Sequence, residues 1–188
     1  MTVQEPTIYE TAREHINLTE VRFTGRVLDV GGGGEGIIGR VGGASVVSID
    51  LREEELREAP GDALRIVMDA CAMRFLEDSF DHVAFFYTLM YMDANQVGRA
   101  LCEARRVLKP DGQLWIWDAV IPDAIEAEAF VAQIEITMPD GSVVTPGYGV
   151  RWTLGQSAEG IAAMCREAGF DIRHLSQSGE AFQIICRT

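Results

Sequence analysis

The chain has 188 residues, 47% hydrophobic and 24% charged, a composition typical of one globular domain with a sizeable core. Its formal net charge of −13 disfavours nucleic acid and anionic membrane surfaces as partners and favours a cationic ligand. No run approaches the length of about 18 apolar residues that a membrane span needs. The N-terminus lacks the basic and apolar regions of a signal peptide, which indicates a cytoplasmic protein.

Several common chemistries are excluded by what the sequence lacks. The four cysteines are far apart and form no C-x-x-C pair, so we expect reduced thiols and no metal site. Lys109 is the only lysine and is not part of a Walker A loop or of the tyrosine-lysine pair of many short-chain dehydrogenases. No G-x-S-x-G nucleophile elbow is present either.

Helices and strands are predicted to alternate along most of the chain. Apolar residues recur at helical spacing in residues 8–18, so we expect residues 1–24 to form a helical cover. Asp93–Leu108 is the clearest helix, because Asp93 and Gln96 suit a capping box. Shorter helices are predicted at 37–41 and 52–58. Strands are predicted at 26–30, 45–50, 64–69, 82–87 and 113–119.

The last third of the chain departs from this alternation. Residues 130–152 contain the partly alternating "FVAQIEIT" and the turn "PDGS", which predict a β-hairpin inserted before the last helix. Ser157 begins that helix and Gly169 ends it. The two strands that follow, 171–177 and 180–187, are joined too closely for a crossover and are predicted to be antiparallel. The pattern as a whole predicts an α/β fold with a mostly parallel sheet in one domain, residues 1–188.

A glycine-rich loop follows the first strand of this sheet, in "VLDVGGGGEG". In an open parallel sheet, ligands bind at the carboxyl ends of the strands, so this loop is a candidate binding site. Gly31, Gly33 and Gly36 satisfy the dinucleotide pattern G-x-G-x-x-G, and Asp50 follows at the distance of the ribose-binding acid. The dinucleotide template alone therefore leaves an NAD(P)-dependent oxidoreductase open.

A second template fits the same loop. The first motif of the class I S-adenosylmethionine-dependent methyltransferases is hydrophobics-D-x-G-x-G-x-G, which Asp29, Gly31 and Gly33 match, while Glu35 stands at the third glycine. Later segments resemble this family in order: "VVSIDLREEEL", "RIVMDACAMRFLEDSFDHVAFFYTLMYM" and "EARRVLKPDGQLWIWD", the last with Asp111 in place of the usual first glycine. The resemblance covers roughly residues 24–120 and the topology of 157–187.

This resemblance implies a Rossmann-like doubly wound sheet of seven strands in the order 3-2-1-4-5-7-6, with the last strand antiparallel. It also implies S-adenosyl-L-methionine as cofactor and S-adenosyl-L-homocysteine as product. By the same resemblance, Asp50 binds the ribose hydroxyls and Leu51 packs on the adenine. Asp69 accepts a hydrogen bond from the adenine amino group, and Ala70 donates its backbone N–H.

The remaining residues that the family implies lie near the methyl donor. Gly31 and Gly33 let the backbone approach the methionyl group and sugar, Asp29 orients the loop or reaches the methionyl ammonium, and Phe86 lies beside the methyl group. Charge supports the cationic cofactor, because acids near the loop repel the pyrophosphate of a dinucleotide by about 1–4 kcal/mol at about 4 Å. We expect Glu35 either to favour the following helix terminus or to face the ammonium.

The acceptor pocket is less defined by sequence. Its candidates are Tyr87, Tyr91 and Asp118, with Trp152 and Tyr148 of the inserted hairpin able to close it. The expected reaction is in-line transfer of a methyl group to a small molecule, with no metal and no catalytic base assigned. Enzymes that methylate amino groups of nucleic acids carry the motif N/D-P-P-Y after the fourth strand. This chain has "FYTL" there, which argues against N-methylation of adenine or glutamine. A non-catalytic protein of methyltransferase fold stays open, as do a monomer and a homodimer.

Overall fold

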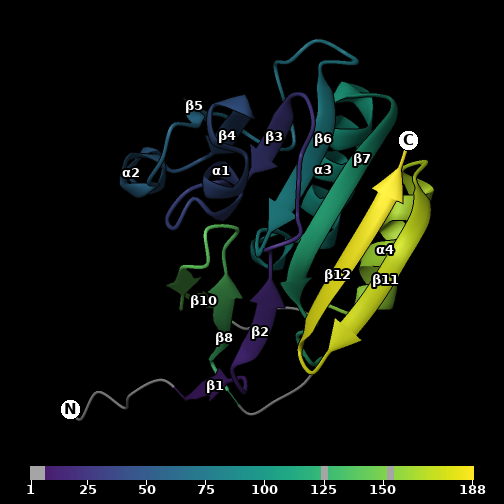
Figure 1. The fold of residues 1–188 in the computed structure, drawn as a ribbon. Helices are drawn as coiled ribbons and strands as arrows, with labels where there is room; N and C mark the ends of the chain where they lie inside the picture. Colours follow the sequence, from purple (N-terminus) through teal and green to yellow (C-terminus); the bar gives the residue numbers. More distant parts are fainter. Residues whose placement is uncertain (1–6, 124–126, 152–154) are drawn as a thin grey trace.

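A computed structural model describes residues 7–123, 127–151 and 155–188 of the chain. Two β-sheets pack against each other, and helices cover the larger one (Figure 1). The smaller sheet lies near the arrowheads of β6 and β7, where the parallel strands of the larger sheet end (Figure 1). The position of the smaller sheet therefore brings it to the edge at which an open α/β sheet binds its ligands.

The larger sheet has seven strands in the order β11-β12-β7-β6-β3-β4-β5. Strand β12 is antiparallel to both of its neighbours, and the five strands from β7 to β5 are parallel to one another. Both the predicted strand order and the antiparallel last strand are confirmed. The strands of this sheet are β3 (Val27–Val30), β4 (Val46–Asp50), β5 (Leu64–Val67), β6 (Phe80–Phe86), β7 (Leu108–Ala119), β11 (Asp171–Ser178) and β12 (Ala181–Arg187).

The helices begin close to the predicted residues. The side chain of Asp93 accepts a hydrogen bond from the backbone N–H of Gln96, and the side chain of Gln96 accepts one from the backbone N–H of Asp93, so the predicted capping box is confirmed. Ser157 caps the last helix in a similar way, through the N–H of Gly160. The helices are α1 (Ile37–Gly42), α2 (Glu53–Glu58), α3 (Ala94–Val107) and α4 (Ala158–Glu167), with short 3-10 helices η1 (Gly43–Ser45) and η2 (Leu89–Tyr91).

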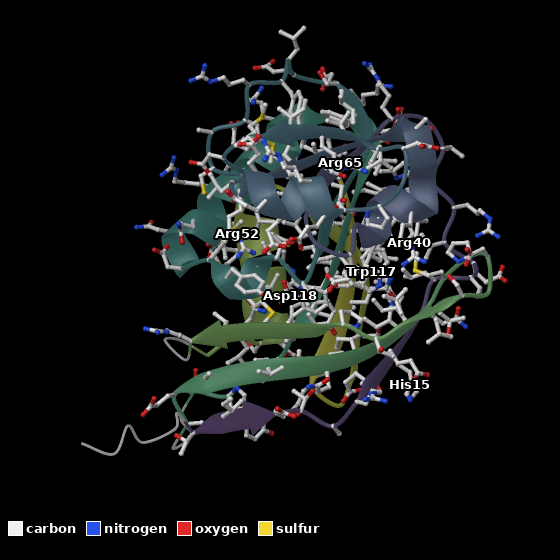
Figure 2. All side chains as sticks on the ribbon, turned by 90° about the vertical axis from the view of Figure 1, so that its left-hand side faces the viewer. His15, Arg40, Arg52, Arg65, Trp117 and Asp118 are labelled. Carbon is white, nitrogen blue, oxygen red and sulfur yellow. The ribbon has the colours of Figure 1, made fainter. Side chains whose placement is uncertain are left out.

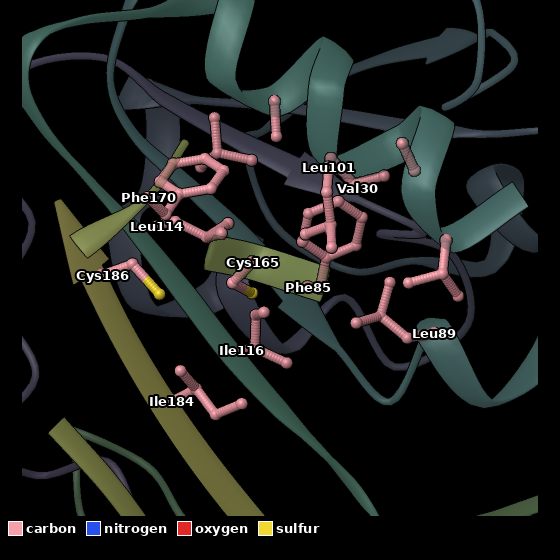
Figure 3. Close-up of a cluster of buried hydrophobic side chains, with 14 of the residues drawn as sticks. Val30, Phe85, Leu89, Leu101, Leu114, Ile116, Cys165, Phe170, Ile184 and Cys186 are labelled. Atoms are coloured by element: carbon pink, nitrogen blue, oxygen red, sulfur yellow. The ribbon is translucent and has the colours of Figure 1, made fainter. Parts of the chain in front are cut away.

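One face of the large sheet packs against α3 and α4. Phe85 and Ile116 of the sheet, Leu101 of α3 and Cys165 of α4 are all fully buried in this core (Figure 3). The strands carry continuous apolar runs because both of their faces are covered. The opposite face packs against α1 and the smaller sheet.

Strand β8 (Ala129–Thr137) is the centre of the smaller sheet. It pairs with β9 (Val143–Val144) and β10 (Gly147–Arg151) in antiparallel fashion, which confirms the predicted inserted hairpin. Buried and half-buried side chains alternate strictly along β8, so one face of the strand packs on Phe86 and Trp117 of the large sheet.

The predicted N-terminal helix over residues 8–18 is wrong. The segment forms two short strands, β1 (Ile8–Glu10) and β2 (Glu14–Asn17), which pair in parallel with the side of β8 opposite to the hairpin. Thr11, between them, donates its N–H to Val131 and accepts from Gln133 through its hydroxyl. The backbone N–H and C=O groups along this side of β8 need hydrogen-bond partners, and the segment supplies them as strands. Its helical spacing of apolar residues is a weak signal, and the local sequence does not show the pairing with β8.

The contact between the two sheets predicts how strongly they fold as one unit. Phe130 of β8 is fully buried between them, so we expect Phe130→Ala to lower the free energy of unfolding by about 3–5 kcal/mol. Urea denaturation followed by circular dichroism measures this loss. Val143→Ala is the control, because Val143 is 56% exposed, and its effect should stay within about 0.5 kcal/mol. A loss below about 1 kcal/mol for Phe130→Ala would contradict the packing.

Candidate functional site

A cavity of about 840 Å³ lies between the glycine loop, the carboxyl ends of β3 to β6 and the inserted hairpin. Its size is within the range of small-molecule and cofactor sites. Glu35 and residues of the inserted hairpin also border it. Ten of the residues predicted from the sequence line this cavity: Asp29, Gly31, Gly33, Asp50, Leu51, Asp69, Ala70, Phe86, Tyr87 and Tyr91.

The glycine loop is held by close contacts that only glycine allows. Gly31 has a φ of +76°, and a Cβ there would lie 2.4 Å from the side chain of Thr88. Its backbone N–H donates to the carbonyl of Ile49 at 2.8 Å, which ties β3 to the end of β4. At Gly33 a Cβ would lie 2.5 Å from the Cβ of Glu55. The loop therefore brings bare backbone to the cavity with no side chain in between.

Asp29 lies under this loop and is almost completely buried. The hydroxyl of Ser48 donates a hydrogen bond to its carboxyl at 3.0 Å. Burial raises the pKa of Asp29 to about 7, although the bond from Ser48 acts in the opposite direction and the nearby Asp50 adds to the rise. A cation bound beside Asp29 would favour the ionised carboxylate.

Asp50 and Asp69 stand at the ends of neighbouring strands with similar local geometry. Each accepts a backbone N–H two residues later through Oδ1, from Arg52 and from Cys71, both at 2.8 Å. These Asx turns fix both carboxylates at the cavity. Leu51 is 67% exposed beside Asp50, whereas Ala70 is buried beside Asp69. Two oriented carboxylates thus flank an apolar side chain, an arrangement suited to a ribose and a flat heterocycle.

The other end of the cavity is aromatic. Tyr87 stacks on Tyr148 of β10, with ring centroids 4.7 Å apart and planes 13° apart. Phe86 meets Tyr148 edge to face, with centroids 6.3 Å apart. Tyr87 is the residue at which the chain leaves β6, and it has an unusual φ of +50°. Backbone strain of this kind is concentrated at functional sites.

The tyrosines of this end stay neutral at ordinary pH. Burial raises the pKa of Tyr91 to about 12 and raises those of Tyr87 and Tyr148 further. They can therefore donate hydrogen bonds, but they do not serve as phenolate bases. Trp152, the other predicted residue of the hairpin, lies outside the described residues.

Asp118 does not line the cavity, contrary to its place among the acceptor candidates. It is fully buried and accepts hydrogen bonds from the backbone N–H groups of Leu89 and Ala119 and from the side chain of Gln156, at 2.8–2.9 Å. Burial nevertheless raises its pKa to about 6. Asp118 ties the end of β7 to the turn after β6, so it fixes the backbone next to Tyr87 without reaching the cavity itself.

Thr88, Arg40 and Glu55 are among the cavity residues that sequence reasoning missed. Thr88 fills the space that Gly31 leaves empty and donates its hydroxyl to the carbonyl of Val30 at 2.9 Å. Arg40 of α1 donates to the hydroxyl of Ser142 at 3.2 Å and lies between α1 and the hairpin (Figure 2). Glu55 of α2 is the third. Each owes its position to a contact between distant segments, for which the local sequence contains no signal.

Comparisons with known proteins agree with this geometry. A family model described as a methyltransferase domain matches residues 28–116. The ubiquinone/menaquinone biosynthesis C-methyltransferase UbiE of Dinoroseobacter shibae is 32% identical over 173 residues, which cover 80% of this chain and 68% of the relative. The chain belongs to the class I S-adenosylmethionine-dependent methyltransferases. It is accordingly an enzyme with S-adenosylmethionine as cofactor, and the dinucleotide interpretation of its glycine loop is set aside.

Solved structures agree on the fold. A protein from Pyrococcus horikoshii OT3 superposes with a TM-score of 0.66 at 19% identity, covering 90% of this chain and 85% of that one. An S-adenosylmethionine-dependent methyltransferase from Methanosarcina mazei gives 0.64 at 19% identity, covering 89% and 94%. Within the described ranges, no helix has the length and apolar content that crossing a membrane requires.

The buried carboxyl of Asp29 predicts a pH-dependent stability. In the unfolded chain its pKa is near 3.8, so between about pH 4 and pH 7 only the unfolded state is ionised. Stability falls as pH rises through this window, by up to about 1.4 kcal/mol per unit, and levels off above pH 7. Asp29→Asn removes this dependence. Between pH 5 and pH 7, its unfolding free energy relative to the parent protein should rise by roughly 2–3 kcal/mol in urea titrations; a constant difference would contradict the raised pKa.

The bonds of Asp118 predict a stability defect rather than a binding defect. Asp118→Ala removes the acceptor of the buried N–H groups of Leu89 and Ala119 and one of the two acceptors of the Gln156 amide, and we expect it to cost about 3 kcal/mol or more of unfolding free energy. Asp118→Asn should also destabilise, because its amide NH₂ would face a backbone N–H. Thermal unfolding measures both variants. If both variants are as stable as the parent protein but no longer bind the acceptor, Asp118 is a residue of the acceptor site after all.

Proposed function

We propose that this enzyme methylates a hydroxylated aromatic ring of quinol type, at a ring carbon. The observation that carries the proposal is the aromatic end of the cavity, where Phe86, Tyr87 and Tyr148 form a wall beyond the glycine loop. Flat rings gain both apolar burial and ring–ring contacts against such a wall. The name of the relative UbiE, a ubiquinone/menaquinone C-methyltransferase, supports the same class of acceptor.

The cofactor would occupy the opposite end. We infer that Asp50 accepts hydrogen bonds from the ribose hydroxyls through the oxygen that its Asx turn does not use, and that Leu51 packs on the adenine. Asp69 would accept from the adenine amino group, while the N–H of Ala70 faces an adenine nitrogen. Asp29 would complement the methionyl ammonium. The residues fit the cofactor, because the cavity combines bare loop backbone with carboxylates suited to its hydroxyls and positive charges.

S-adenosylmethionine supplies a methyl group whose bond to sulfur breaks as the acceptor carbon takes the methyl, leaving the electron pair on sulfur and the ring proton to water. The chain itself contributes alignment and exclusion of water, which can account for much of the rate of such a displacement. Gly31 and Gly33 keep side chains out of the approach path. The neutral tyrosines of the aromatic end orient the acceptor without removing its proton.

Methylation assays test the proposal. Purified protein with S-adenosylmethionine should add one methyl group to 1,4-dihydroxynaphthalene under reducing conditions, and loss of a ring C–H signal in proton NMR identifies carbon as the acceptor atom. A saturated diol of the same ring size should not react. Methylation only at oxygen, or equal methylation of the saturated diol, would contradict a ring-carbon acceptor.

Two acid variants test the cofactor site separately from methylation. Asp50→Ala should weaken S-adenosylhomocysteine binding at least 30-fold by calorimetry, because two hydrogen bonds to a carboxylate, each worth about 1.5 kcal/mol or more, are lost. Glu54→Ala, at an exposed position of the adjacent helix α2, should leave the affinity unchanged. Equal affinities for the two variants would contradict the role of Asp50.

A further inference from the structure

Tyr148 reaches the acceptor end of the cavity from outside the methyltransferase sheet. It belongs to β10 of the inserted hairpin, where it pairs with Ala132 of β8. Half-buried and exposed residues alternate along β10, so the side chain of Tyr148 points toward the large sheet. Its neighbours Gly147 and Gly149 lie at the exposed positions and carry no side chain. The ring therefore projects from a small-residue stretch into the space beside the glycine loop.

Two contacts hold this ring in place. Its face stacks on Tyr87, and its edge meets Phe86. The hairpin turn is also tied to α1, since Arg40 donates a hydrogen bond to Ser142. An aromatic side chain fixed in this way loses little conformational freedom when a ligand binds, which favours a specific contact.

The two hydroxyls of the stacked pair have different surroundings. The Tyr87 hydroxyl is buried without a hydrogen-bond partner among the described residues, and the charges that act on it come from Asp118 and Glu14. Burial and then the charge of Glu35 are the main causes that raise the pKa of Tyr148. Tyr148 is only half-buried and lines the cavity together with Glu35, whereas Tyr87 is 2% exposed, so Tyr148 is the member of the stacked pair that is more open to the cavity.

We propose that Tyr148 is a specificity-determining residue, whose hydroxyl donates a hydrogen bond to a ring oxygen of the acceptor while its ring, braced by Tyr87, forms part of the acceptor wall. The inference rests on the proposed function, because it names the residue that selects a hydroxylated aromatic ring. The hydroxyl stays protonated at neutral pH and can therefore act as the donor. The inserted hairpin thus carries the recognition of the acceptor, and the sheet carries that of the cofactor.

A double-mutant cycle tests Tyr148 in binding experiments that need no methyl transfer. It removes the hydroxyl of Tyr148, the hydroxyl of the ligand, or both, and compares the affinities. Calorimetry measures binding of 2-naphthol and of naphthalene to the enzyme saturated with S-adenosylhomocysteine. Tyr148→Phe should weaken 2-naphthol about five- to tenfold, the value of one hydrogen bond, and naphthalene less than twofold. Tyr148→Leu should weaken both ligands, because the ring is lost as well. Tyr9→Phe, in the same sheet but outside the cavity lining, should change neither affinity.

The outcomes separate the two proposals. S-adenosylhomocysteine affinity and thermal stability should be the same in Tyr148→Phe and the parent protein, so a binding loss reports on the acceptor. If 2-naphthol binds the parent and the Phe variant equally, or binds neither, the role of Tyr148 is overturned. If the cycle shows the expected coupling but no phenol is methylated, the binding role of Tyr148 is upheld and the ring-methylation proposal fails.

Discussion

The approach of Gly31 to Thr88 sets the geometry of the whole site. A side chain at Gly31 would collide with Thr88, so the absence of one lets the turn after β6 lie directly against the glycine loop. Thr88 then bonds the carbonyl of Val30, and the following residue, Leu89, bonds Asp118 at the end of β7. Three parallel strands are thus locked together at their carboxyl ends. The cavity is rigid at its base because these contacts are made by backbone and short side chains.

The carboxylates and the aromatic side chains that line the cavity lie at opposite ends of it. Carboxylates lie beside the loop and at the ends of β4 and β5, whereas the aromatic rings lie beyond β6 and on the hairpin. The first group suits a molecule with hydroxyls and positive charge, and the second suits a flat apolar ring. Such a division lets one cavity hold two different molecules without either occupying the place of the other.

Much of the large sheet could be predicted from the sequence, and the smaller sheet could be predicted only in part. Strands such as β6 are continuous apolar runs ended by turn residues, and Asp93 with Gln96 defines α3 locally. The N-terminal strands gave no such signal, since their pairing depends on β8, more than 100 residues later. Asp118 likewise could not be assigned from its position, because strand ends hold both ligand-binding and supporting carboxylates.

The central position of β8 affects how the chain reaches its native state. Strand β8 is paired on one side with the start of the chain and on the other with the hairpin that follows it. Contacts between residues so far apart in sequence close longer loops and tend to form more slowly than contacts between neighbouring segments. The strands that end at the glycine loop and at Asp50 pair with segments closer in the sequence. The parallel strands around the glycine loop are therefore expected to form before β8 pairs with β1 and β2, so the start of the chain is among the last segments to assemble.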